Sequence, residues 1–174
     1  MVMMKNIVLI GLPGSGKSTL GKLLADELNC TYYDMDCVIE DNLNQSIISI
    51  FKDKGEAYFR EIEYNVADKI TKHNQASVIA TGGGVVTMQK TMVVLKENGY
   101  TIFLNRPLNK IYADIETKNR PLLRDNIFRL ESLYNQRIHL YREYADYIID
   151  NNGEINNCLD KLIEVSNKIL LANT

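Results

Sequence analysis

Residues 6–19 read NIVLIGLPGSGKST, and this stretch decides the fold. An apolar run at 6–10 ends at the first glycine, and residues 11–18 match the pattern G-x-x-x-x-G-K-[ST]. The run indicates a buried parallel strand, and leucines recur at helical spacing after the loop. They are Leu20, Leu23, Leu24 and Leu28. The chain is therefore expected to begin with a strand, a glycine-rich loop and a helix.

The loop itself indicates phosphate binding. Its glycines let successive backbone N–H groups approach phosphate oxygens, and the start of the helix adds a partial positive charge. Lys17 supplies a cation for the β- and γ-phosphates, and the hydroxyl of Ser18 is a ligand for Mg²⁺. The predicted nucleotide contacts are Gly14, Ser15, Gly16, Lys17, Ser18 and Thr19. The alternative, a chance glycine-rich turn, explains neither the spacing nor its place between a strand and a helix.

Strand and helix patterns alternate along the rest of the chain. Strands are predicted at 7–10, 31–35, 78–80, 100–104 and 147–149. Helices are predicted at 17–28, 38–73 with breaks, 88–97, 108–146 with a break near Pro121, and 154–171. This alternation predicts one domain over residues 1–174, a three-layer α/β/α fold with a five-stranded parallel sheet. Ligands of such folds bind at the carboxyl ends of the strands.

Composition narrows the class of protein. The formal net charge of −2 argues against nucleic acid as a partner. No apolar run approaches the ~18 residues of a membrane-spanning helix, and the first residues lead straight into the loop, unlike a cleaved signal peptide. The three cysteines show no C-x-x-C spacing and are expected to be reduced thiols. We expect a cytoplasmic monomer with small-molecule substrates.

Two carboxylates follow the second predicted strand. If residues 34–36 are extended, the side chains of Asp34 and Asp36 point the same way. One could support Mg²⁺ through water, and the other could accept a proton from an attacking hydroxyl. A solvated strand end is the alternative, and the neighbouring phosphate loop disfavours it.

Three glycines, Gly82, Gly83 and Gly84, follow the third predicted strand where many phosphate-loop hydrolases have an acidic Mg²⁺ ligand. The metal carboxylate must then come from elsewhere, and Asp34 is the nearest candidate. The glycines indicate backbone lying close to a small ligand, with a tight turn before the next helix as the alternative.

Arginines supply candidate anion contacts. Arg60 shares a helix face with Glu56 and Glu63, and spacing alone favours a surface ion-pair ladder there. Arg137 interrupts an apolar helical stripe, so it needs a buried partner or a ligand carboxylate, and we favour the ligand. Arg120, beside Pro121, lies in a polar stretch expected to form a mobile lid at about 114–126 over the nucleotide.

Taken together, the motifs resemble those of shikimate kinases. The resemblance covers residues 6 to about 150, through GLPGSGKST (11–19), DMD (34–36), FKDKGEAYFREIE (51–63), TGGG (81–84), RPLL (120–123) and the spacing R-x-x-x-Y-x-x-x-A (137–145). It implies an adenylate-kinase-like fold and an ATP- and Mg²⁺-dependent phosphorylation of the 3-hydroxyl of shikimate.

The resemblance also implies roles for the candidate residues. Asp36 would hold the substrate hydroxyls and act as base or positioner, and Asp34 would support Mg²⁺ through water beside Ser18. Arg60 and Arg137 would bind the substrate carboxylate, next to the backbone of residues 82–84. Lys17 would stabilise the transferring phosphates. Arg120 would be the lid arginine on ATP.

Three positions depart from the family pattern: Asn44 for a common glycine, Ala113 for a common basic residue, and His139 for a common proline. They bear on helix geometry and nucleotide contacts rather than on the chemistry. Two alternatives stay open: a kinase of another small metabolite such as gluconate, and a non-catalytic nucleotide-binding module. The binding module is disfavoured, because the chain retains Lys17, both aspartates and the arginines. A nucleoside monophosphate kinase is also less favoured, because no long second lid is evident.

Overall fold

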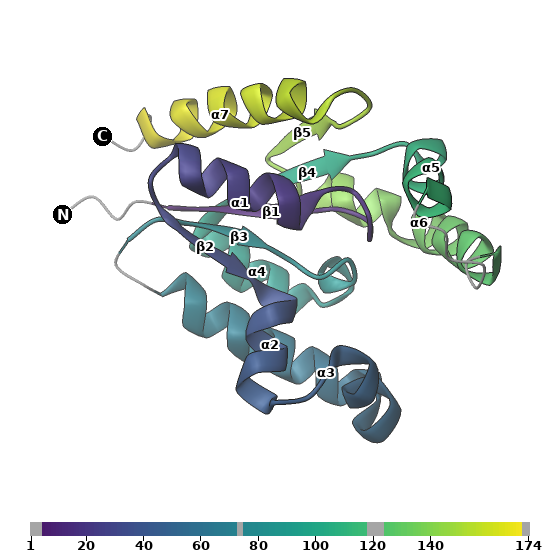
Figure 1. Cartoon of the computed structure of the whole chain (residues 1–174). Coiled ribbons are helices and arrows are strands. Elements are labelled where there is room, and N and C mark those ends of the chain that lie inside the picture. Colours follow the sequence, from purple (N-terminus) through teal and green to yellow (C-terminus); the bar gives the residue numbers. More distant parts are fainter. Residues whose placement is uncertain (1–4, 73–74, 118–123, 172–174) are drawn as a thin grey trace.

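A five-stranded parallel sheet forms the centre of the protein (Figure 1). The computed structural model describes residues 5–72, 75–117 and 124–171. The strands lie in the order β2-β3-β1-β4-β5. Their bounds are β1 Asn6–Ile10, β2 Thr31–Asp34, β3 Ser77–Ala80, β4 Gly99–Asn105 and β5 Tyr147–Asp150. The central strand pairs Val8 with Ile79 on one side and with Thr101 on the other. The predicted strands are therefore confirmed, each to within a residue or two.

Helices cover both faces of this sheet. They are α1 Lys17–Glu27, α2 Met35–Leu43, α3 Ile47–Thr71, α4 Gln89–Glu97, α5 Leu108–Thr117, α6 Arg124–Tyr144 and α7 Ile155–Leu171, with the 3-10 helix η1 at Val85–Thr87. Figure 1 shows α1 and α7 on one face and α3 and α4 on the other. The predicted three-layer α/β/α class is confirmed.

The two cores follow from the alternation of side chains along the buried strands. On β1, Ile7 and Leu9 pack with α1 and α7, whereas Val8 and Ile10 pack in the larger core with α2, α3, α4 and α6. All four of these side chains are buried. Because helices cover both faces of the sheet, a ligand can reach polar side chains only at the ends of the strands. The loops after β1, β2 and β3 lie together at the carboxyl ends of these strands.

One helix boundary differs from the prediction. The pattern predicted a strand through residue 35, but β2 ends at Asp34 and α2 begins at Met35. The long predicted helical region is two helices, and the second bends at Gly55, whose φ of 81° is in the left-handed region. After this bend, the helix buries Phe59, Arg60 and Glu63.

The middle of the predicted lid, residues 118–123 with Arg120 and Pro121, lies outside the described residues. The described helices on either side end at Thr117 and begin at Arg124. Within the described ranges, none of the helices has the length and apolar character needed to cross a membrane.

Candidate active site

The phosphate loop joins β1 to α1 and encloses the ammonium group of Lys17. Gly16 precedes the helix with a φ of 96°, which a glycine adopts without strain. Lys17 is 7% exposed, and its Nζ donates to the carbonyl oxygens of Gly11 and Leu12, both at 2.8 Å. Burial lowers the pKa of Lys17 to about 8, although Asp36 and Asp34 oppose this shift. The lysine is thus held at the loop, where phosphate oxygens could replace the two carbonyls.

A cavity of about 520 Å³ opens beside this loop. Its lining comes from the loop and α1, from the start of α5, and from the segment between β5 and α7. Asn151, buried in that last segment, donates from Nδ2 to the Ser15 carbonyl oxygen at 2.9 Å. This bond ties the phosphate loop to the segment between β5 and α7. The cavity is large enough for a nucleotide.

Two side chains with oxygen donors, Ser18 and Asp34, lie at the opening of the loop. Ser18 Oγ donates to Asp34 Oδ2 at 2.6 Å, and Tyr32 Oη donates to the same oxygen at 3.2 Å. A hydroxyl and a carboxylate are hard donors that fit Mg²⁺, which keeps waters and takes phosphate oxygens as further ligands. The described residues hold no group of three or more His, Cys, Asp or Glu side chains suited to a metal ion. These donors thus fit a cation that arrives with a triphosphate.

The expected extended geometry of Asp34 and Asp36 is wrong. Asp34 is the residue before α2, and its Oδ1 accepts from the backbone N–H groups of Asp36 at 3.1 Å and Cys37 at 3.4 Å. An aspartate in this position caps a helix, which is why β2 stops there. Asp36 lies in the first helical turn, still close enough to Lys17 to affect its pKa. The helix start, rather than strand alternation, brings both carboxylates to the loop.

Asp36 faces the triple-glycine turn together with Glu63. A Cβ on Gly82 would lie 2.9 Å from Asp36 Oδ1 and 3.1 Å from Glu63 Oε1, so both carboxylates press against this backbone. Burial and the nearby Asp34 raise the pKa of Asp36. Burial also raises the pKa of Glu63. A proton acceptor strengthened in this way suits an alcohol substrate.

Arg60 lies beside the carboxylates of Asp36 and Glu63, against the same triple-glycine turn. Its guanidinium donates to Glu63 Oε2 at 2.7 Å and to Glu56 Oε1 at 3.0 Å. The ion pairs favoured by spacing therefore form. Their expected place on the surface is wrong, because Arg60 is 7% exposed and Glu63 is fully buried. A Cβ on Gly84 would lie only 2.1 Å from Arg60 Nη2. The glycine is therefore required for the arginine to reach this position.

Arg137 approaches the same turn from α6. Its Nη1 donates to the Gly83 carbonyl oxygen at 3.2 Å, and the Tyr141 hydroxyl donates to that oxygen as well. Tyr141 is fully buried and stacks on Phe103, with ring centroids 5.1 Å apart. Burial raises the pKa of Tyr141 to about 12, so its proton stays available for this bond. The backbone bond satisfies one guanidinium nitrogen and leaves the half-buried Arg137 able to bind a carboxylate.

The structure thus brings the predicted residues together at two adjoining ends. The nucleotide end, named for the ligand predicted there, comprises Lys17, Ser18 and Asp34 with the loop. The acceptor end, also named for its predicted ligand, comprises Arg60, Glu63, Arg137 and residues 82–84. Asp36 lies between the two ends. Arg120 lies outside the described residues. Sequence reasoning placed Glu63 on the face of Arg60 without giving it a place in the site. Burial, which spacing does not reveal, sets Glu63 apart.

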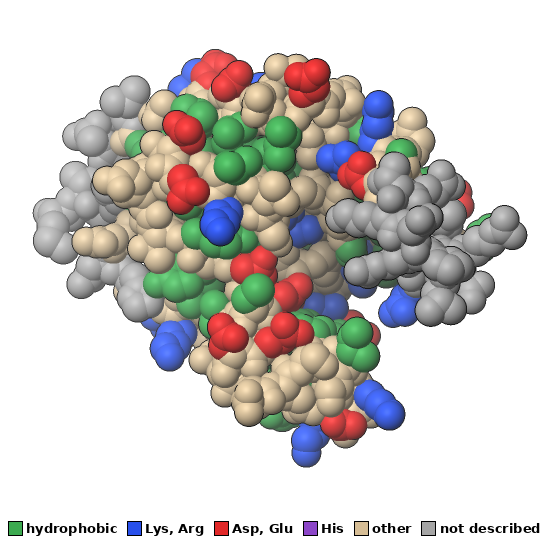
Figure 2. All heavy atoms as spheres, in the orientation of Figure 1, with side chains coloured by type: hydrophobic (Ala, Val, Ile, Leu, Met, Phe, Trp, Pro, Cys, Tyr) green, Lys and Arg blue, Asp and Glu red, His purple; other side chains and the backbone are tan. Residues whose placement is uncertain are grey.

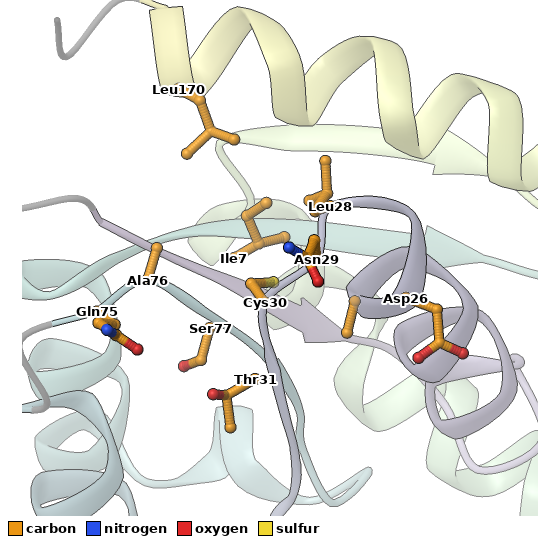
Figure 3. A pocket seen from close by; sticks show the side chains of 11 residues that line it. Ile7, Asp26, Leu28, Asn29, Cys30, Thr31, Gln75, Ala76, Ser77 and Leu170 are labelled. Atoms are coloured by element: carbon orange, nitrogen blue, oxygen red, sulfur yellow. The ribbon is translucent and has the colours of Figure 1, made fainter.

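A second cavity, of about 590 Å³, lies at the opposite edge of the sheet (Figure 3). Figure 3 shows Ile7, Thr31 and Ser77 in its lining, and these residues stand at the beginnings of β1, β2 and β3. The chemistry-bearing residues described above lie at the other ends of these strands. The larger cavity is therefore not the candidate active site.

Charged side chains of both signs lie on one face of the protein. On the described part of the face in Figure 2, acidic and basic side chains are interspersed, and the basic ones form no continuous stripe. Nucleic-acid binding proteins usually present such a stripe.

The sequence model of the family described as shikimate kinase matches residues 13–167. The chain belongs to the shikimate kinase family. The shikimate kinase of Clostridium botulinum (strain Alaska E43, type E3) is 42% identical to it over 171 residues, which are 98% of this chain and 100% of the relative. The resemblance predicted from the motifs is confirmed, and with it an ATP-using kinase.

Solved structures agree with the family assignment. A shikimate kinase from Acinetobacter baumannii in complex with shikimate matches with a TM-score of 0.83 at 33% identity, over 99% of this chain and 96% of that one. A gluconokinase from Sinorhizobium meliloti also matches, with a TM-score of 0.63 at 11% identity, over 99% and 97% of the two chains. The second likeness shows a shared fold alone, so it lends no support to the gluconate alternative.

Proposed function

We propose that this chain transfers the γ-phosphoryl group of ATP to the 3-hydroxyl of shikimate, giving shikimate 3-phosphate and ADP. The observation that carries the proposal is the position of Asp36. Its carboxylate, with a raised pKa, lies between the phosphate-loop lysine and the arginines of the acceptor end. An acceptor bound there by its carboxylate has a hydroxyl close to a base and to the transferring phosphoryl group.

The nucleotide end would hold ATP through the loop. Backbone N–H groups of residues 14–19 surround the phosphates, and Lys17 exchanges its carbonyl partners for β- and γ-phosphate oxygens. Ser18 and Asp34 would hold Mg²⁺, Asp34 through water. When bound, the ion neutralises developing charge on the phosphates. Arg120 would complete the donor site from the lid.

The acceptor end would orient shikimate. Arg60 and Arg137 suit a carboxylate because a guanidinium offers a planar fork of donors. Gly82, Gly83 and Gly84 keep the backbone close enough to line the substrate. Asp36 would bind the ring hydroxyls and accept the proton of the attacking one, or hold that hydroxyl in line. Phosphoryl transfer depends mainly on positioning and charge stabilisation. These residues supply groups of both kinds.

Two broader expectations belong to the same proposal. The chain would act as a monomeric cytoplasmic enzyme, as a single domain whose lid spans about residues 114–126. Its reaction would serve the biosynthesis of aromatic amino acids.

The test is a coupled ADP-release assay with ATP and Mg²⁺, in which shikimate, gluconate and no acceptor are compared. We expect release that depends on shikimate. Release with gluconate alone would favour the other small-metabolite kinase. Confirmed ATP binding without release under any condition would instead favour the nucleotide-binding module.

A further inference from the structure

The Gly83 carbonyl oxygen accepts hydrogen bonds from two side chains of one helix. Arg137 Nη1 donates to it at 3.2 Å, and the Tyr141 hydroxyl donates to it from one turn further along α6. Tyr141 is fully buried, and its ring stacks on Phe103 of β4. The proposed function gives Arg137 the acceptor carboxylate as its ligand and gives Tyr141 no part. A buried hydroxyl therefore lies beside the acceptor end without an assigned role.

The turn that Tyr141 contacts has little stiffness of its own, because a glycine can adopt many backbone conformations and residues 82–84 are all glycines. The carbonyl oxygens of Gly82 and Gly84 accept from N–H groups of η1. Gly83 lies against the phosphate loop, since a Cβ on it would be only 2.6 Å from Cδ of Pro13. Its carbonyl oxygen is held from the other side, by α6. The orientation of this peptide group thus depends on the side chains of α6.

Tyr141 also lies next to Arg137 itself. Burial raises the pKa of Tyr141 to about 12, and the Arg137 guanidinium beside the hydroxyl opposes this rise. A phenol is both a donor and an acceptor, so its oxygen can face the guanidinium while its proton goes to the Gly83 carbonyl oxygen. A guanidinium held by one bond to a carbonyl is free to turn about that bond. The phenol oxygen restricts this turning.

We infer that Tyr141 is a positioning residue for the acceptor, which fixes the Gly83 carbonyl and holds the Arg137 guanidinium in the orientation that receives the acceptor carboxylate. The inference rests on the proposed function, because it takes this carboxylate to be that of shikimate. A bidentate pair between guanidinium and carboxylate requires a defined orientation of both groups. An arginine that is held in advance loses less freedom when the ligand binds. Tyr141 acts through Arg137 and the turn.

The experiment is a double-mutant cycle of Tyr141→Phe and Arg137→Met. Isothermal titration calorimetry would measure shikimate and ADP binding, with Mg²⁺, on the unaltered chain, both single variants and the double variant. Steady-state kinetics would give the shikimate KM and kcat. Tyr141→Phe keeps the ring that stacks on Phe103 and removes the hydroxyl.

We expect Tyr141→Phe to weaken shikimate binding roughly fivefold and to raise the shikimate KM to match, while kcat and ADP affinity change by less than about twofold. The carboxylate is remote from the reacting hydroxyl, so binding is lost equally in the ground state and the transition state. In the Arg137→Met background, the same change should weaken shikimate binding by less than about twofold, because the arginine that Tyr141 positions is already gone.

The matched control is Tyr144→Phe. Tyr144 is half-buried on the same helix, and its bonds to Lys96 and Thr101 are made by its backbone carbonyl oxygen. This variant should leave both affinities, the shikimate KM and kcat unchanged.

Three results would overturn the inference. Unchanged shikimate affinity in Tyr141→Phe would show that the hydroxyl is not needed. A loss that is as large with Arg137→Met as without it would show that Tyr141 acts independently of the arginine. A loss of kcat and ADP affinity together with shikimate affinity would show a general structural role. If the unaltered chain binds ADP but not shikimate, the proposed function fails and the inference fails with it, and this result is distinct from the other three.

Discussion

Polar groups at the nucleotide end of the site have partners in the free protein, whereas the acceptor end keeps buried charge without full compensation. Lys17 donates to two loop carbonyls, and Asp34 accepts from Ser18, Tyr32 and the start of α2. Glu63 is fully buried, and its Oε1 has no hydrogen-bond partner among the described residues. The pKa values of Asp36 and Glu63 are both raised by burial.

This difference indicates different responses to ligands. A preformed loop needs little rearrangement to bind phosphate, since each protein bond that breaks is replaced by a phosphate bond. The acceptor end gains more from its ligand, because a substrate hydroxyl can donate to the carboxylate oxygen of Glu63 that otherwise has no partner among the described residues. Substitutions at the acceptor end should therefore change acceptor binding, rate and stability together, whereas those at the nucleotide end should mainly change nucleotide and Mg²⁺ binding and phosphoryl transfer.

The largest effect is expected from Asp36→Asn. Loss of the proton acceptor should lower kcat by about 10²–10⁴ while ADP affinity stays nearly unchanged. The folded-state pKa of Asp36 is raised, so its ionised form destabilises the fold above the unfolded pKa. The variant should therefore be at least as stable as the unaltered chain at neutral pH, and that gain should fade in acid. Steady-state kinetics and urea unfolding at two pH values measure both effects; a variant with near-normal turnover would refute the role of Asp36.

A comparison of Arg60→Met with Arg137→Met comes next. Removing Arg60 leaves the buried carboxylate of Glu63 without its counter-charge, which should cost about 3 kcal/mol of unfolding free energy. Removing Arg137 loses a bond to the Gly83 carbonyl oxygen, which Tyr141 still serves, so about 1 kcal/mol is expected. Both should weaken shikimate binding, Arg137→Met by roughly 100-fold. Denaturant titrations and shikimate titrations measure the two quantities.

A second substitution, at the ion-pair partner Glu63, serves as a control for Arg60→Met. Adding Glu63→Gln to Arg60→Met should recover part of the lost stability, because the unpaired charge is removed. ATP binding should change little in any of these variants. Equal losses of ATP and shikimate binding in Arg137→Met would instead show a structural arginine.

Local features of the fold could be predicted from the sequence, because their causes lie within a few residues. The phosphate loop, the strands and the sheet class follow from glycine spacing and apolar runs. The same reasoning failed at Asp34, since a D-x-D sequence suits both a strand end and a helix cap. Only the bonds from Asp34 to the N–H groups of Asp36 and Cys37 decide between them.

Features that depend on distant contacts could not be predicted. Spacing placed Glu56, Arg60 and Glu63 on one face, but it could not show that Gly84 leaves room for Arg60 to be buried. The stripe on α6 indicated that Arg137 points inward, and the Gly83 carbonyl that it meets lies 54 residues away in the sequence.

A smaller effect is expected from Tyr32→Phe at the nucleotide end. The Tyr32 hydroxyl donates to Asp34 Oδ2 and to the Ser18 carbonyl oxygen, both at 3.2 Å, and so positions the carboxylate beside the Ser18 hydroxyl. Without it, the Mg²⁺ concentration that gives half-maximal ADP binding should rise several-fold, while shikimate binding stays the same. The exposed Tyr147 offers a control in Tyr147→Phe. An unchanged Mg²⁺ dependence in Tyr32→Phe would remove the phenol from the metal site.

The smallest expected effect is a proton taken up by Lys17 when nucleotide binds. Its pKa in the free protein is lowered to about 8, so part of the population is neutral near that pH. Phosphate oxygens favour the charged form and raise this pKa, so ADP binding at pH 8 should be accompanied by uptake of a fraction of a proton. The sign follows: affinity should be full below about pH 8 and should fall modestly as pH rises through that value. Calorimetry in buffers of different ionisation enthalpy measures the uptake directly, with shikimate as the ligand that should show none from this lysine. Zero proton uptake with ADP would mean that Lys17 is already fully charged in the free loop. The nucleotide end would then resemble the acceptor end, because both would keep a buried charge in the absence of ligand.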